Sequence, residues 1–233
     1  MSSGMTRPRR VALSVAVALM MVAVVMWWME ASRFTPRADE GSLEQLGDYG
    51  GVPAFSLTER SGRLITREDL RDHISVIDFI YTECTETCPT QSLQMAQLER
   101  EFAEARDLRL VSITVDPRHD TPKVLARYAE RYQADDRWWF LTGAQHAIYC
   151  LAKDGFRLGV VDSSTSQSAP CGERLGFGPR AAWASHGGKG LIMHSARFVL
   201  VDRGTRIRAY HLATDAASMQ ALRGNLRRLL SGR

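Results

Sequence analysis

The sequence VIDFIYTECTETCPTQSL, residues 76–93, decides the predicted fold. Its first part, residues 76–81, is rich in β-branched and aromatic residues, which favours a buried strand over a helix. A helix should follow, because Pro89 suits the first helical position, where its missing N–H costs no hydrogen bond. Cys88 then lies at or beside the N-cap, and Cys84 lies in the loop before it.

The start of a helix changes the chemistry of a nearby cysteine. Unpaired backbone N–H groups and the positive end of the helix dipole stabilise a thiolate relative to a thiol. We therefore expect Cys88 to have a lowered pKa and to be available as a nucleophile or a metal ligand. A purely structural disulfide between Cys84 and Cys88 is the poorer interpretation, because this placement activates a thiol rather than sheltering it.

Predicted strands and helices alternate along most of the chain. Apolar runs predict strands at 108–115, 138–141, 156–161, 192–201 and 207–211. Helical spacing of apolar residues predicts helices at 93–105, 121–132, 144–153 and 215–230. This order predicts an α/β protein of thioredoxin-like fold, with a central mixed sheet and helices on both faces.

The N-terminal region predicts a membrane anchor. Residues 11–29 form an apolar run that only Ser14 interrupts, and as a helix this run nearly spans a hydrocarbon core of about 30 Å. Three arginines precede this segment and no acid occurs before Glu30, so residues 1–10 should be cytoplasmic and the rest extracytoplasmic. We predict a single-pass protein of the inner membrane with its domain in the periplasm. A cleaved signal peptide fits less well, since its apolar region is usually shorter.

Beyond the anchor, the composition predicts a tether and one large domain. Residues 30–50 are polar and without a sustained period, and residues 51–233 form the predicted domain, with a Ser-, Gly- and Pro-rich insertion at 162–190. The formal charge of +4 lies partly in the N-terminal arginines, so it gives no case for nucleic-acid binding. We expect Cys150 and Cys171 to pair in an exported domain, the alternative being a buried Cys150 and an exposed Cys171 as thiols.

The cysteine pair can also hold a metal. Two soft thiolates select Cu(I), zinc or an iron–sulfur cluster, and one added imidazole suits copper in particular, whereas structural zinc needs a fourth protein ligand. Of the six histidines, His194 is the best candidate for the imidazole. It directly precedes residues 195–201 of the predicted strand at 192–201, where a loop could lie over the cysteine end of a thioredoxin-like sheet.

Three blocks of this sequence resemble the signature motifs of the Sco/SenC family: FIYTEC followed by CP within 79–89, TVDPRHDTP at 114–122, and HS with FVLVD within 194–202. The resemblance implies a membrane-anchored, thioredoxin-fold copper protein with a copper ion bound by Cys84, Cys88 and His194. It also implies a role in assembling the copper centre of a cytochrome oxidase. The expected partners are the copper-binding subunit of that oxidase and a thioredoxin-like reductant.

Some residues depart from the family pattern. Thr85 and Glu86 follow the first cysteine where the family usually has Pro-Asp or a similar pair, and Met193 stands where it usually has Asp. The insertion that carries Cys171 is also outside that pattern. These changes leave the three expected ligands in place and bear on partner specificity and copper affinity.

Two other functions are compatible with the same cysteines. In a thiol–disulfide oxidoreductase, Cys88 or Cys84 would attack a target disulfide and the other would resolve the mixed disulfide. In a peroxidase of related fold, a cysteine of low pKa would react with peroxide. Nearby, Asp116 and Asp120 are expected either to cap the turn before Pro122 or to support the metal ligands.

Overall fold

The computed structural model describes residues 19–28, 43–85, 87–158, 160–161, 171, 192–193 and 196–232. The chain divides into two units, Met1–Ser42 and Leu43–Arg233. In the first unit residues 19–28 are helical, and their large apolar side chains are exposed. Among the described residues, no helix is both long enough and apolar enough to span a membrane. The predicted span at 11–29 extends beyond the described residues at both ends, so the anchor stays a prediction.

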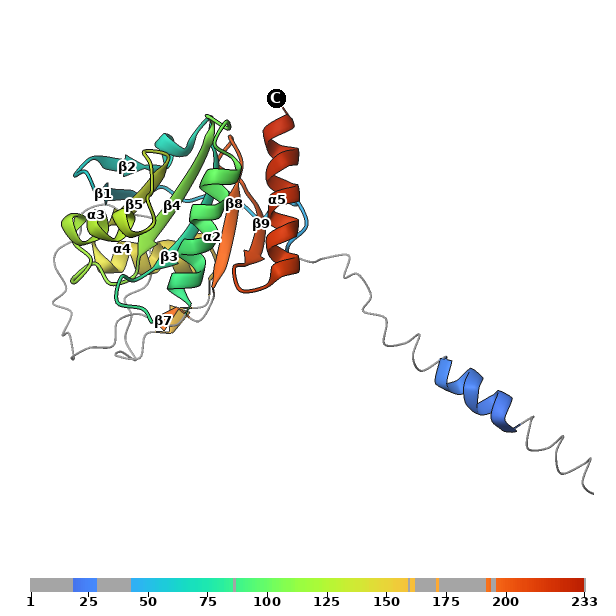
Figure 1. The fold of residues 1–233 in the computed structure, drawn as a ribbon. Helices are drawn as coiled ribbons and strands as arrows, with labels where there is room; N and C mark the ends of the chain where they lie inside the picture. The colour runs from blue at the N-terminus through green and yellow to red at the C-terminus, as the bar shows by residue number, and fades with distance from the viewer. Residues whose placement is uncertain are drawn as a thin grey trace, which may run out of the picture. The chain divides into compact units, whose positions relative to one another are not determined.

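The second unit is built on a seven-stranded mixed sheet of its described residues, in the order β2-β1-β5-β4-β3-β8-β9 (Figure 1). Strands β3, β4 and β5 are parallel, and the other neighbours pair antiparallel. The strands are β1 (Ser56–Glu59), β2 (Leu64–Thr66), β3 (Ile74–Ile80), β4 (Leu108–Thr114), β5 (Trp138–Thr142), β8 (Arg197–Val201) and β9 (Ile207–Leu212). A separate pair joins β6 (Val160–Val161) to β7 (Ile192–Met193).

Helices cover both faces of the sheet, as predicted. Helices α2 (Cys88–Glu101), α3 (Pro122–Arg131) and α5 (Ala216–Ser231) pack on the face of β3 that carries Val76 and Ile80. The opposite face, with Ile77 and Phe79, packs against α4 (Gln145–Cys150) and the π-helical turn η2 (Leu151–Gly155). Every residue of β3 is buried because the strand is central and covered on both sides.

Two segments differ from the sequence predictions. Residues 47–52 run beside β9 and hydrogen-bond to it and to the turn before it, so part of the predicted tether belongs to the compact unit. The strand predicted at 156–161 is limited to β6 at its end, because Phe156 instead closes η2. The N–H of Phe156 donates to the carbonyl oxygen of Leu151 at 2.8 Å.

Candidate metal and thiol site

The two cysteines lie where the parallel strand β3 ends and helix α2 begins. The N-cap is Thr87, so α2 starts at Cys88 and Pro89 is its second residue, one position later than predicted. The N–H of Cys84 donates to the carbonyl oxygen of Tyr81 at 3.2 Å, which closes a turn directly after β3. The N–H of Cys88 donates to the Sγ of Cys84 at 3.4 Å. The start of the helix therefore directs one of its backbone donors at the first sulfur, and neither cysteine forms a disulfide.

The two sulfurs differ in their environment. Cys88 is only 4% exposed, whereas Cys84 is partly exposed. Burial raises the pKa of the Cys88 thiol well above its ordinary value, and its contact with Cys84 raises it further. The expectation that Cys88 would have a lowered pKa is therefore wrong. Loss of water around the thiolate outweighs the favourable helix dipole, and Cys84 is the sulfur that an incoming metal or disulfide reaches first.

The cysteine loop is held by a buried carboxylate from the β4–α3 connection. Asp120 is fully buried, and it accepts hydrogen bonds from the Thr82 N–H at 3.0 Å, the Thr82 hydroxyl at 2.5 Å and the Thr114 hydroxyl at 2.5 Å. Capping of α3 is performed by Thr121, which accepts from the N–H of Val124. Of the two roles considered for Asp120, support of the cysteine loop is the one that the geometry shows.

A histidine next to Asp120 also faces the cysteine loop. The Nδ1 of His119 lies 3.0 Å from Asp120 Oδ1, and its Nε2 lies 3.2 Å from Glu83 Oε1, beside Cys84 in sequence. The hydrogen bond to Asp120, together with the nearby Glu83 charge, raises the pKa of His119. The sequence alone did not single out His119, because this pairing joins residues 36 positions apart in the chain.

A second buried carboxylate lies in β3 beneath α2. Asp78 is fully buried, accepts a hydrogen bond from the Ser112 hydroxyl at 2.6 Å, and has a second oxygen with no hydrogen-bond partner among the described residues. The indole N–H of Trp138 donates to the same Ser112 oxygen at 2.9 Å. Burial raises the pKa of Asp78 to about 7. Its negative charge also raises the pKa of Cys88, which links this carboxylate to the thiol site.

The third predicted ligand, His194, lies outside the described residues, as does Glu86. The two residues directly before His194 form β7, which ends at Met193. Among the described residues there is no group of three or more His, Cys, Asp and Glu side chains that could hold a metal. The structure thus brings Cys84 and Cys88 together, and the imidazole ligand stays a prediction.

The other described histidines have partners elsewhere in the domain. His211 is fully buried in β9, where its Nε2 lies 3.2 Å from Asn225 Nδ2 and burial lowers its pKa to about 4. His146 contacts the Sγ of Cys150 from one turn earlier in α4. His73 precedes β3, and burial lowers its pKa.

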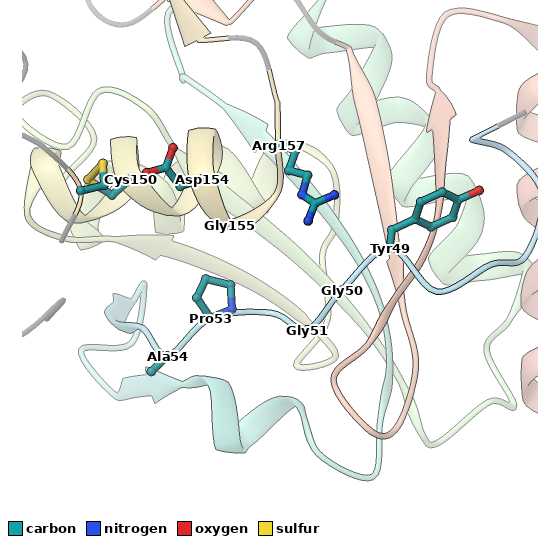
Figure 2. Close-up of a pocket in the computed structure, with 10 residues that line it drawn as sticks. Tyr49, Gly50, Gly51, Pro53, Ala54, Cys150, Asp154, Gly155 and Arg157 are labelled. Carbon is teal, nitrogen blue, oxygen red and sulfur yellow. A yellow bond between two sulfur atoms is a disulfide. The ribbon is translucent and has the colours of Figure 1, made fainter. Parts of the chain in front are cut away.

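The remaining two cysteines form a disulfide. Cys150, at the end of α4, is joined to Cys171 with a Cα–Cα distance of 5.6 Å. The bond attaches residue 171, within the predicted insertion, to the helix that covers one face of the sheet. It borders a cavity that is lined from the other side by Tyr49, Gly50, Gly51, Pro53 and Ala54 (Figure 2).

Known proteins are similar to this chain in sequence and in fold. The sequence profile of a family described as SCO1/SenC matches residues 44–231. The SCO1 protein homolog of Bacillus subtilis is 36% identical over 109 residues, which make up 46% of this chain and 56% of that protein. The match therefore spans about half the length of this curated relative.

Two solved structures share the fold with lower sequence identity. BsSco, described as a member of the Sco family of cytochrome c oxidase assembly proteins with a disulfide switch, gives a TM-score of 0.61 at 24% identity. That likeness covers 81% of this chain and 99% of BsSco. ScoI of Bradyrhizobium japonicum with copper bound gives a TM-score of 0.57 at 22% identity, over 77% of this chain and 99% of that chain.

Proposed function

Because this chain belongs to the SCO1/SenC family, we propose that it is a copper-binding metallochaperone that helps to assemble the copper centre of a cytochrome c oxidase. One observation carries the proposal: two cysteine sulfurs meet at the start of α2, with the N–H of Cys88 directed at the Sγ of Cys84. A solved relative with copper bound supports the choice of metal, and another from a family of cytochrome c oxidase assembly proteins supports the choice of pathway.

The proposed ligands of the copper ion are Cys84, Cys88 and His194. Two thiolates and one imidazole form a soft set that favours Cu(I). Because burial raises the pKa of Cys88, its thiol keeps its proton until a metal displaces it, so copper binding should release a proton from this residue. The partly exposed Cys84 would receive and release the ion first. Copper would then pass by ligand exchange to cysteines and histidines of the oxidase subunit.

The location proposed for this activity is the periplasmic face of the inner membrane. Residues 11–29 would anchor the chain, with residues 1–10 in the cytoplasm and a tether leading to the domain. Outside the cytoplasm a cysteine pair is readily oxidised, and an oxidised pair cannot bind copper through thiolates. A thioredoxin-like reductant would therefore be needed to keep Cys84 and Cys88 available.

Copper titration of the reduced protein tests the proposed ligand set. We expect one copper ion per chain and a sulfur-to-copper charge-transfer band when Cu(II) is added. His194→Ala should lose the band or weaken copper binding, whereas the control His186→Ala, within the predicted insertion at 162–190, should keep both. Unchanged binding in His194→Ala would remove His194 from the site and with it the three-ligand proposal.

Deletion of the gene tests the role in the cell. Loss of oxidase activity that is restored by added copper would support copper delivery. Loss of activity that copper does not restore would favour the second candidate function, reduction of exported disulfides.

That second candidate is a thiol–disulfide oxidoreductase, favoured by the unequal exposure of the two sulfurs. The Cys84 thiolate would attack a target disulfide, and Cys88 would then resolve the mixed disulfide and release the reduced target. In a Cys88→Ser variant, Cys84 should trap target proteins as mixed disulfides, and copper depletion should not change the yield. Failure to trap any exported protein would count against this role.

A further inference from the structure

We propose that the disulfide between Cys150 and Cys171 is a second thiol-exchange site, reduced by a small amino-acid thiol that enters the cavity beside it. The class of reductant is a thiol that carries both an ammonium and a carboxylate, such as cysteine. This site is separate from Cys84 and Cys88, and the proposal does not depend on copper binding there.

The two cysteines of this disulfide are unequally exposed. Cys150 is 4% exposed at the end of α4, whereas Cys171 is partly exposed. A thiolate must reach the sulfur that it attacks, and the sulfur on the far side of the bond then leaves as a thiolate. The exposure therefore assigns Cys171 as the attacked sulfur and Cys150 as the leaving group.

A histidine lies beside the leaving sulfur. The Nε2 of His146 is 3.5 Å from the Sγ of Cys150 and its Nδ1 is 3.9 Å away, since the two residues are one helical turn apart in α4. A thiolate forming at a buried sulfur is unstable without a hydrogen-bond donor or a proton. An imidazolium N–H in this position donates to the sulfur and supplies the proton as the bond breaks.

The disulfide opens into a cavity of about 360 Å³ with complementary charges in its wall. Figure 2 shows Asp154 on the same helical segment as Cys150, with Arg157 beyond Gly155. Neither charged side chain forms a hydrogen bond or an ion pair with the described residues. An amino-acid thiol would place its sulfur at the disulfide, its ammonium at Asp154 and its carboxylate at Arg157.

Two further features support Arg157 as a ligand-binding residue. Its φ angle is 52°, a left-handed conformation that a residue with a side chain keeps only where the surrounding structure holds it. Its charge acts on Tyr210, whose buried hydroxyl has no hydrogen-bond partner among the described residues. Tyr210 packs edge-on against Tyr49 of the cavity wall, with ring centroids 5.6 Å apart.

The reaction uses two thiols for each disulfide. The first thiolate bonds to the Sγ of Cys171, the bond to Cys150 breaks, and the Cys150 sulfur takes a proton from His146. The second thiolate attacks the ligand sulfur of the mixed disulfide, and Cys171 leaves and is protonated from solvent. The products are two cysteine thiols in the chain and one small-molecule disulfide, so the reductant is oxidised and the protein is reduced.

The test uses the full chain with Cys84→Ser and Cys88→Ser, so that only this disulfide can react. After a brief exposure to limiting cysteine, new thiols are alkylated and the chain is digested with trypsin. Cleavage at Lys153 and Arg157 separates the two cysteines. We expect the added cysteine on the peptide with Cys171 and the alkyl group on the peptide with Cys150. The reverse distribution, or no reduction at all, would overturn the proposal.

Three thiols then test the charges in the cavity wall. Arg157→Gln should slow reduction by cysteine and by N-acetylcysteine roughly two- to fivefold, as expected for the loss of one exposed ion pair. Reduction by cysteine ethyl ester, which has no carboxylate, should keep its rate. Asp154→Asn should slow reduction by cysteine and by the ester, and it should not change the rate of reduction by N-acetylcysteine, which has no ammonium. Lys153→Gln, an exposed cation of the same segment that does not line the cavity, is the matched control. Equal effects on all three thiols would exclude recognition of the amino-acid group.

The role of His146 is tested with His146→Gln, which keeps a hydrogen-bonding side chain but cannot supply a proton. We expect reduction to slow about tenfold or more with every thiol, because general acid catalysis acts on the leaving sulfur whatever the attacker. The neighbouring Gln145→Ala should react at the parent rate. A His146→Gln variant that also reacts at the parent rate would exclude the proton transfer.

Discussion

Thr82 donates two hydrogen bonds to Asp120, from its backbone N–H to Oδ2 at 3.0 Å and from its hydroxyl to Oδ1 at 2.5 Å. The loop that carries Cys84 is thereby attached to the connection between β4 and α3. Thr114 at the end of β4 donates to the same carboxylate. The position of the cysteine loop thus depends on a residue 36 positions away from Cys84 in the chain.

Replacing Asp120 should therefore loosen the cysteine loop. Asp120→Ala leaves two partly buried donors of Thr82 and the buried hydroxyl of Thr114 without this acceptor, and we expect a loss of about 1–3 kcal/mol in the free energy of unfolding. Copper affinity should fall about 10- to 100-fold, the range for residues that position metal ligands. Denaturant unfolding and copper competition measure the two effects. Asp116→Ala is the control, and equal losses in both variants would argue against a specific role of Asp120.

The exposure of the two thiols predicts an order of alkylation. Cys84 should react with iodoacetamide at least about tenfold faster than Cys88, because Cys88 is buried and burial raises its pKa. Fragment mass spectrometry of the reduced wild-type protein locates the first alkyl group. Denaturation should abolish the difference. Preferential labelling of Cys88 in the folded protein would contradict the assigned roles.

Asp78 should make the protein less stable as the pH rises. Its pKa of about 7 in the folded protein lies above the ordinary value of 3.8. Between these two pH values the folded protein keeps a proton that the unfolded chain has lost, so the free energy of unfolding falls from pH 4 to pH 7.

The variant Asp78→Asn removes this proton equilibrium. The difference in free energy of unfolding between the variant and the wild type should change by roughly 4 kcal/mol at most between pH 4 and pH 7, in favour of the variant. Denaturant titrations of both proteins at several pH values give this difference directly. A constant difference across the range would mean that Asp78 does not change its protonation there.

His211 should have the opposite effect over an overlapping pH range. Burial lowers its pKa from 6.5 to about 4, so the unfolded chain binds a proton that the folded protein does not. The stability that comes from the neutral imidazole is complete above pH 6.5 and is lost as the pH falls toward 4.

His211→Gln should therefore be less sensitive to acid than the wild type. The difference in free energy of unfolding between the two should change by roughly 3 kcal/mol at most between pH 6.5 and pH 4, in favour of the variant. His119→Gln is a useful comparison, because His119 is partly exposed and its pKa is raised. An identical acid response in His211→Gln and wild type would show that this residue is not buried in the neutral form.

Much of the fold follows from local patterns in the sequence. The run at residues 76–81 predicts the central strand, because β-branched and aromatic side chains fit a sheet that is buried on both faces. Pro89 marks the helix start to within one residue, since proline is tolerated only in the first turn. By contrast, the helix predicted at 144–153 ends in the π-helical turn η2, whose form was not predicted, because it depends on the packing of Phe156 against Phe79 across the core.

The sequence by itself determined the strand, the two-cysteine loop, the helix start and the family blocks, since each depends on neighbouring residues and their conformational preferences. Only the tertiary structure decided how the two cysteines differ. The burial of Cys88 and the charge of Asp78 raise its pKa against the helix dipole, and Asp120 fixes the loop from another part of the chain. Solvation and long-range contacts depend on which distant residues meet, and no local pattern specifies that.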